Sequence, residues 1–496
     1  MSVAADDGAT VRFETPAGRW VLAATVLGSG VASLDATVVN LALPHLAENL
    51  DADFAGLQWV VTSYTLSLAS LILLGGALGD RFGRRRVFSI GLAWFAVASL
   101  LCAVAPTIAV LTAARLLQGV GGALLVPGSL AIISASFHPD DRSRAIGAWS
   151  GLGGVTMAVG PFLGGWIVAA SWRYIFLLNL PLIAAVLAIT LRHVPETRDP
   201  DAAGPIDAWG AVTGAGGLAA MTFALIQQDA RIGALGAVLL VTFVVVELRE
   251  AHPMLPMSVF RNRQFSAANA VTLVIYGALS MVMFLVGLVL QTALGYSPLA
   301  AGASLLPVTI IMLVLSARSG ALAGRIGPRL QMAIGPCIVA AGMALMVRIA
   351  PGVGYADAVL PAVVVFGLGL AATVAPLTST VLAAADARHA GVASGVNNAV
   401  ARTAGLLAVA AVPLITGFDP NTSVDAAALV DGFHRAALVG AIACVVGGAL
   451  AALLIANDVL RPAAPATIEP DTADVPCFHC GVDATPLVTT RRTPAP

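Results

Sequence analysis

The sequence contains no lysine and few charges of either sign. Only 11% of its 496 residues are charged, all 26 basic residues are arginine, and the formal net charge is −1. Soluble proteins carry about 25% charged residues, and nucleic-acid-binding proteins carry an excess of basic ones. We therefore predict neither a soluble domain nor a nucleic-acid partner. The replacement of lysine by arginine, together with the high alanine and glycine content, points to a GC-rich bacterial genome.

Signatures of catalysis and of metal binding are also missing. The sequence has no Walker A loop, no Gly-x-Ser-x-Gly and no His-Glu-x-x-His, so we predict no enzyme and no cofactor. Cys102, Cys337 and Cys444 lie in apolar runs, which argues against a disulfide framework. Cys477 and Cys480 form one pair in a polar tail, and because a structural zinc ion needs four ligands we predict no metal site.

Long apolar runs dominate what is present. The chain is 58% hydrophobic with a mean hydropathy of +0.90, and a membrane helix needs about 20 mostly apolar residues. Fourteen runs approach that length, which predicts an all-α membrane protein with fourteen transmembrane helices. The predicted spans are 20–43, 57–79, 87–105, 108–133, 145–169, 173–191, 208–227, 232–248, 266–292, 299–317, 329–348, 358–383, 393–416 and 435–456.

One loop between spans occurs twice. The segment Gly76-Ala-Leu-Gly-Asp-Arg-Phe-Gly-Arg-Arg85 reappears 244 residues later as Gly320-Ala-Leu-Ala-Gly-Arg-Ile-Gly-Pro-Arg329. The repeat predicts two six-helix bundles with an inserted helix pair between them, an arrangement typical of transporters whose substrate site lies between the halves. The predicted parts are an N-terminus (1–19), a first bundle (20–192), a linker with two extra spans (193–265), a second bundle (266–457) and a disordered tail (458–496).

The arginines predict the orientation of the chain. With both termini in the cytoplasm, twenty arginines lie in cytoplasmic segments and four in outer loops. Cytoplasmic loops carry an excess of basic residues, so this orientation is favoured. We expect a monomeric, multi-pass protein of the bacterial inner membrane, in contact with the lipid bilayer, with both ends inside.

Two charged residues within spans are the principal functional candidates. Asp35 lies in the middle of the first span, where a charge costs at least ~2.5–3.5 kcal/mol and so requires a cavity or a partner. It could exchange a proton or meet a cationic substrate, or be a structural acid bonded to a neighbouring helix. Its helical face is formed by small residues and suits the lining of a cleft. Arg115 in the fourth span could tune a carboxylate or hold an anion, or simply extend towards the outer surface.

Two glycine-rich segments are further candidates. The fifth span carries a stripe of small residues that allows close packing and sliding or bending, although packing alone could explain it. The repeated loop could act as a gate or serve only as an orientation signal. The residues concerned are Gly151, Gly154, Gly160, Pro161, Gly164 and Gly165 in the span, and Gly76, Asp80, Arg81, Gly83 and Arg84 in the loop. Secondary candidates are Asn40, Gln118 and Arg402.

These segments together resemble the drug/proton antiporters with fourteen spans in the major facilitator superfamily, over residues 20–456. The resemblance rests on Leu34–Pro44, Gly75–Arg86, Arg115–Gly122, Gly151–Gly165 and Trp172–Pro181. It implies proton coupling at Asp35, proton transfer assisted by Arg115, an export motif at Gly160 and Pro161, and a conformational gate at Asp80 and Arg84. The thirteenth span, around Arg402, is poorer in glycine than the family pattern.

The sequence therefore predicts a proton-coupled exporter of amphipathic organic compounds such as drugs or antibiotics, working by alternating access. A symporter or facilitator of a small metabolite, or a non-transporting membrane sensor, are the alternatives. The prediction depends on two homologous bundles that rock about a shared cavity into which Asp35 points.

Overall fold

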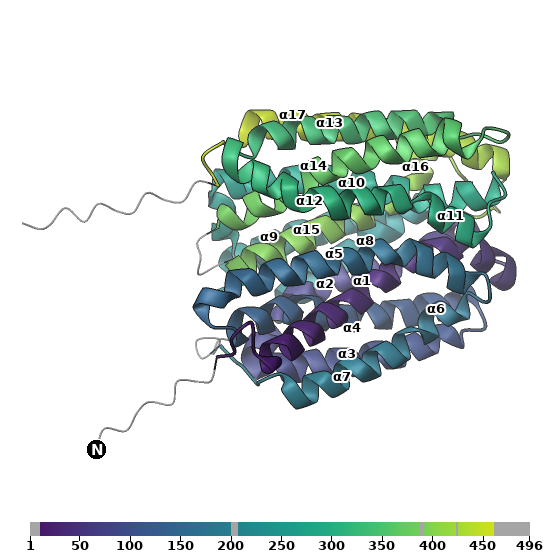
Figure 1. The fold of residues 1–496 in the computed structure, drawn as a ribbon. Coiled ribbons are helices and arrows are strands. Elements are labelled where there is room, and N and C mark those ends of the chain that lie inside the picture. Colours follow the sequence, from purple (N-terminus) through teal and green to yellow (C-terminus); the bar gives the residue numbers. More distant parts are fainter. Residues whose placement is uncertain (1–9, 200–206, 386–389, 423–424, 461–496) are drawn as a thin grey trace, which may run out of the picture. The chain divides into compact units, whose positions relative to one another are not determined.

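The computed structural model describes residues 10–199, 207–385, 390–422 and 425–460, which belong to one compact unit. The predicted tail, with Cys477 and Cys480, lies outside the described residues. Helices make up almost all of this unit (Figure 1). Those of the first half are α1 (Pro16–Leu50), α2 (Phe54–Phe82), α3 (Arg84–Ala103), α4 (Ile108–Ser136), α5 (Pro139–Val168), α6 (Arg173–Leu177) and α7 (Asn179–His193).

Two helices, α8 (Ala208–Gln227) and α9 (Ala230–Arg249), follow and precede the second half. The second half consists of η1 (Met257–Arg261), α10 (Arg263–Thr292), α11 (Pro298–Ser304), α12 (Leu306–Ile326), α13 (Arg329–Leu345), η2 (Met346–Arg348), η3 (Tyr355–Val359), α14 (Leu360–Ala383), α15 (Ala390–Ala410), α16 (Val412–Thr416) and α17 (Ala426–Leu454).

Polar caps define where many of these helices begin. In each case a side-chain oxygen accepts a hydrogen bond from a backbone N–H of the first turn, which would otherwise lack a partner. The capping residues are Thr15, Asp53, Thr107, Asp207, Asp229, Asn262, Ser297 and Asp425. Apolar runs fill the helices between the caps, which is why hydropathy located the helices, although several of their ends lie six to nine residues from the predicted ones.

Twelve helices or pairs of consecutive helices, among the residues described, are long and apolar enough to cross a membrane. The other two predicted spans, 145–169 and 393–416, coincide with α5 and with α15 and α16. In α5 the apolar stretch whose side chains are described is Val159–Val168, and part of the helix before it lies outside the described side chains. The protein is a multi-pass membrane protein, and the count of fourteen spans stays a prediction.

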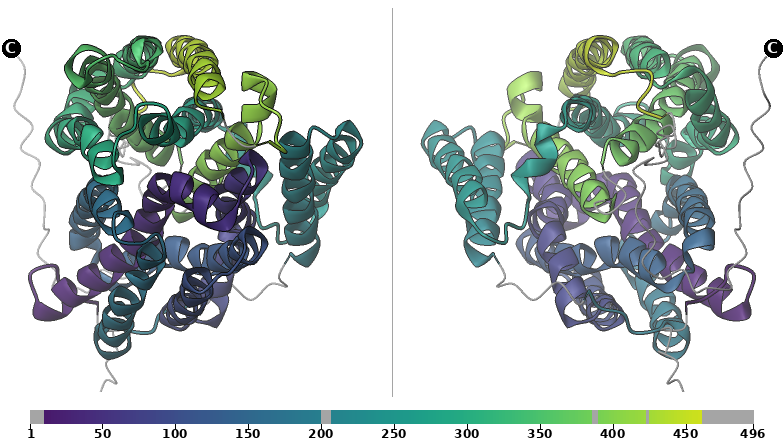
Figure 2. Two further views of the ribbon diagram at one scale, coloured as in Figure 1. Left: turned by 90° about the vertical axis from the view of Figure 1, so that its right-hand side faces the viewer. Right: turned by 90° about the vertical axis from the view of Figure 1, so that its left-hand side faces the viewer.

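Helices of the same half contact one another most. Helix α1 packs on α4, α5 and α7, and α10 packs on α15 and α17. In Figure 1 the purple and blue helices of the first half lie together below the green and yellow helices of the second. Helices α8 and α9 pack on each other at one side of the other helices, where α8 touches α2 and α15 (Figure 2). This is the position expected for an inserted pair.

The repeated loop has the same backbone shape in both halves. Gly83 ends α2 with φ +109°, and Gly327 ends α12 with φ +86°, both in a region that side chains disfavour. A Cβ atom at Gly83 would lie 2.7 Å from a Glu196 carboxylate oxygen, and one at Gly327 would lie 2.7 Å from the carbonyl oxygen of Asn457. Each loop is therefore covered by the segment that follows the last helix of its own half.

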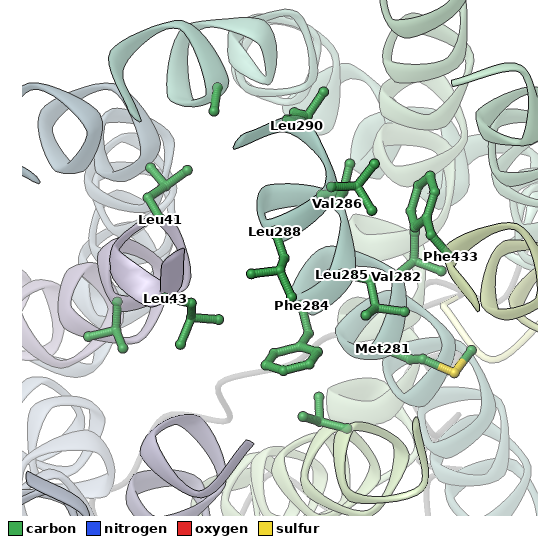
Figure 3. Packing of buried hydrophobic residues seen from close by; sticks show 14 of the residues in the cluster. Leu41, Leu43, Met281, Val282, Phe284, Leu285, Val286, Leu288, Leu290 and Phe433 are labelled. Carbon is green, nitrogen blue, oxygen red and sulfur yellow. The ribbon is translucent and has the colours of Figure 1, made fainter. Parts of the chain in front are cut away.

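The hydrophobic core joins the halves near one end of the helices, at the α1–α2 turn. A single cluster there contains Leu41 and Leu43 of α1 together with Phe284 and Leu288 of α10. Figure 3 shows these side chains facing each other across the boundary between the halves. Near the opposite end, where α2 meets α3, each half has its own cluster. The halves thus close on each other at the α1–α2 end.

Candidate functional site

Asp35 and Arg115 form an ion pair that is almost completely withdrawn from the surface. Each side chain is 1% exposed, and Arg115 Nη1 donates to Asp35 Oδ2. Helices α1 and α4 bring the two groups together from positions 80 residues apart. In such surroundings, removal of one partner leaves an uncompensated charge at a cost of ~3–5 kcal/mol.

Polar side chains from three helices complete the surroundings of the Asp35 carboxylate. Gln118 Nε2 and Asn179 Nδ2 donate to Asp35 Oδ1 over 2.8 Å and 2.9 Å. Both amides also donate to Ser99 Oγ, over 2.9 Å and 3.3 Å respectively. Gln118 in turn accepts a 2.6 Å bond from Arg115 Nη1 through its Oε1. Both oxygens of the Asp35 carboxyl group therefore accept hydrogen bonds.

Arg115 is held independently of Asp35 as well. Its Nε donates to the carbonyl oxygen of Val60 over 3.1 Å, and its guanidinium lies 4.4 Å from the centre of the Tyr64 ring and 5.9 Å from that of Phe176. The alternative in which Arg115 extends to the outer surface is wrong, because its guanidinium is buried, pairs with the Asp35 carboxylate and lies against the Tyr64 ring.

Three members of this network were not predicted from the sequence. Ser99 and Tyr64 gave no signal, because single polar or aromatic residues in a span are common. Asn179 lies in the segment Trp172–Pro181, which the family resemblance had included without assigning it a role. An intramembrane Asn two residues before a proline was the available signal.

The position of Asp35 differs from the expectation in one respect. The small residues on its face do not line a cleft: Gly28 packs on the Phe88 ring, and the Ala32 carbonyl accepts a bond from the Tyr64 hydroxyl. All partners of Asp35 belong to the first half of the chain. In this conformation the acid lies inside the first half, and its pointing into a shared cavity is not observed.

The structure brings Asp80 and Arg84 of the repeated loop together. Arg84 Nη2 and Nε lie 2.7 Å and 2.8 Å from Asp80 Oδ1. Glu196, which the sequence analysis did not select, accepts from the backbone N–H groups of Arg85 and Arg86 at the start of α3. A carboxylate favours a helix N-terminus, so Glu196 fastens the segment after α7 to this loop. Two further loop candidates lie beside this pair: Gly76 packs near Pro127 of α4, and Arg81 stacks on Phe82.

Three glycines of α5 mark places of close helix contact. A Cβ at Gly160 would lie 2.5 Å from Thr37 Oγ1, and one at Gly164 would lie 2.8 Å from Val38, both on α1. One at Gly165 would lie 2.4 Å from the carbonyl oxygen of Pro298, at the start of α11. Helix α5 is therefore wedged between α1 and the second half.

The contacts of Pro161, a further α5 candidate, are described, whereas those of Gly151 and Gly154 are not. The carbonyl oxygen of Pro161 lies against Gly302 of α11. Gly151 and Gly154 lie on α5, in a stretch outside the described side chains.

Two of the secondary candidates stand apart from the Asp35 network. The amide oxygen of Asn40 is buried and has no hydrogen-bond partner among the residues described. Arg402, on α15, is half-buried, and the structure gives it no hydrogen bond or ion pair with any described residue. In that same part of the chain, no group of three or more potential metal ligands occurs.

Comparison with known proteins gives the family. Residues 25–410 match the family model described as the Major Facilitator Superfamily. The methylenomycin A resistance protein of Bacillus subtilis (strain 168) is 35% identical over 83% of this chain and 90% of its own length. The puromycin resistance protein of Streptomyces alboniger is 33% identical over 95% and 96%. The tetracenomycin C resistance and export protein of Streptomyces glaucescens is 32% identical over 84% and 80%.

Solved structures agree on the fold. A D-xylose-proton symporter aligns with a TM-score of 0.63 over 90% of this chain and 99% of that one, at 16% identity. A bacterial homologue of the lysosomal transporter Spinster, in an inward-facing and unoccupied conformation, aligns with a TM-score of 0.64 over 89% and 97%, at 14% identity. The chain therefore belongs to the Major Facilitator Superfamily, as a relative of its multidrug and antibiotic resistance and export proteins.

Proposed function

We propose that this protein exports amphipathic organic compounds from the cell in exchange for protons, by alternating access. The buried Asp35–Arg115 pair carries the proposal: it is a carboxylate within a span whose only charged partner in the network is an arginine. The relatives named for antibiotic resistance and export support an organic substrate. The superfamily transports solutes and does not catalyse reactions, so no cofactor is proposed.

The proton acts on the ion pair. An arginine stays protonated, so the member of the pair that can gain or lose a proton is Asp35. When Asp35 is ionised, its charge binds α1 to α4 through Arg115. A proton on Asp35 removes that attraction and leaves the guanidinium without a counter-charge. The arrangement described here is then destabilised by ~3–5 kcal/mol, enough to shift a conformational equilibrium by at least a hundredfold.

The direction of opening follows from the core and from the arginines. Twenty of the 26 arginines fall in the two termini and in the loops on the same side of the membrane as the termini. We therefore place that side on the cytoplasmic face of a bacterial inner membrane. The halves are joined by the core at the α1–α2 end, which is then the outer end. The conformation corresponds to closure outside, in which substrate enters from the cytoplasm. A monomer contains all of these elements.

Reconstitution into liposomes tests the proposal. With an imposed pH gradient and a fluorescent amphipathic dye, we expect dye to move opposite to the protons. Asp35→Asn should insert normally and exchange dye for dye, but should not accumulate dye in response to the gradient. Movement of dye in the same direction as protons, or an unchanged response in Asp35→Asn, would refute proton exchange at this residue.

A further inference from the structure

The middle of the helix assembly contains a positive charge that nothing nearby balances. Asp35 and Arg115 neutralise each other, and Arg402 remains. The second-half helices α10, α12, α13, α14 and α15 contain no Asp or Glu in their sequences. Among the residues described, Arg402 has no hydrogen bond or ion pair. A guanidinium keeps its proton at such depth, so the charge cannot be relieved by deprotonation.

Arg402 lies where the two halves meet. At 100° per residue it shares a face of α15 with Gly395, Leu406 and Val409. This face meets α2: Gly395 lies near Leu73, Leu406 belongs to a cluster of buried apolar side chains contributed by both halves, and the Val409 carbonyl accepts a 2.6 Å bond from α2. The guanidinium is therefore on the side of α15 that faces the first half, about 18 Å along the helix from its first residue.

Two tyrosines lie within the electrostatic reach of Arg402, one from each half. They are Tyr64 of α2, whose ring stacks on Arg115, and Tyr276 of α10. Asp35, which also acts on Tyr64, is already paired with Arg115 and does not balance the charge of Arg402. Because the Arg402 side chain is only half-buried, the N–H groups of its guanidinium can donate hydrogen bonds to a ligand.

We propose that Arg402 binds the acidic group of the transported compound, so that the substrates are amphipathic organic acids. The inference rests on the proposed export function. A planar guanidinium offers two parallel N–H donors to a carboxylate, sulfonate or phosphate, and the geometry suits such groups better than a neutral oxygen. The half-buried side chains of Tyr276 and Leu73 supply contact for the organic body of the substrate. No covalent step is involved.

Binding of two matched dyes tests this directly. The probes are 1-anilinonaphthalene-8-sulfonate and N-phenyl-1-naphthylamine, which share the same aromatic body and differ by the sulfonate. Fluorescence titration uses the full chain in lipid nanodiscs, with empty nanodiscs subtracted. Arg402→Gln should weaken binding of the sulfonate at least tenfold and binding of the neutral dye by no more than about twofold, the difference expected for a charge-assisted hydrogen bond. Arg402→Lys should lie between.

Arg435→Gln serves as the control, because Arg435, near the start of α17, already donates to the backbone carbonyl of Thr416 at the end of α16, so the change should leave both dyes unaffected. An equal loss of both dyes in Arg402→Gln, or sulfonate binding that is the same in Arg402→Gln as in the unmodified protein, would overturn the assignment. Transport is measured separately in liposomes. If the dye difference persists while no gradient-driven export occurs, the anion site stands and the proposed export function fails.

Discussion

The ion pair between Asp35 and Arg115 permits a quantitative prediction by a double-mutant cycle. Asp35→Asn leaves the Arg115 guanidinium buried without a counter-charge, and Arg115→Gln leaves the carboxylate with only its amide donors. Each single change should cost ~3–5 kcal/mol of stability. In the double variant no charge is left unpaired, and two amides can still hydrogen-bond. The double variant should therefore cost about as much as one single change, which gives a coupling energy of at least ~3 kcal/mol.

Unfolding in detergent can be followed with a thiol-reactive fluorescent dye. Cys102 and Cys444 are buried and react only when the helices separate, whereas Cys337 is exposed. Cys337, Cys477 and Cys480 are replaced by Ser in every variant, so that only the two buried thiols report unfolding. Denaturant titrations at one pH then give free energies for the four members of the cycle. The same measurement reports whether each variant inserts and folds.

The matched control is an ion pair at the surface. Arg144 Nη1 lies 3.1 Å from Glu14 Oε1, with both side chains largely exposed. The corresponding cycle, with Glu14→Gln and Arg144→Gln, should give a coupling of ~1 kcal/mol or less, because water screens the pair. If the Asp35–Arg115 coupling is no larger than this control, the two groups do not depend on each other, and the reasoning about proton control of α1 and α4 fails.

Three further predictions follow from single contacts. Gly83→Ala should lose ~1–3 kcal/mol of stability because its φ of +109° strains a side chain, and an unchanged denaturation midpoint would contradict this. Gly165→Ala should stop efflux while insertion continues, since the new methyl would meet the first turn of α11; Gly147→Ala, with open space around its Cβ, is the control and should export normally. Asn179→Ala removes a donor to Asp35 and should cost ~1.5–3 kcal/mol in the same thiol assay, and equal stability would show that this bond is dispensable.

The order and approximate positions of the helices were largely predictable from the sequence, but several helix ends were not. A membrane-spanning helix needs about 20 consecutive, mostly apolar residues, and such a run can be recognised directly in the sequence. The repeated loop was predictable for a similar reason: Gly83 and Gly327 are required where the chain turns with positive φ, and the same requirement acts in each half. The predicted 145–169 span coincides with α5, although the helix begins several residues earlier, at Pro139.

The site was predictable only in part, because a sequence indicates how deep a residue lies more readily than which residue lies beside it. The position of Asp35 along its apolar run placed it in mid-span, and the cost of a charge there required a cavity or a partner. Nothing local identified that partner as Arg115, or added Ser99 and Asn179 from other helices, since lateral neighbours depend on how the helices are arranged around one another. The same reasoning explains Glu196, which meets the loop around Gly83 from more than 100 residues away. Depth follows from position along a span, whereas pairing follows from the packing of the helices, and the chemistry of this protein depends on pairing.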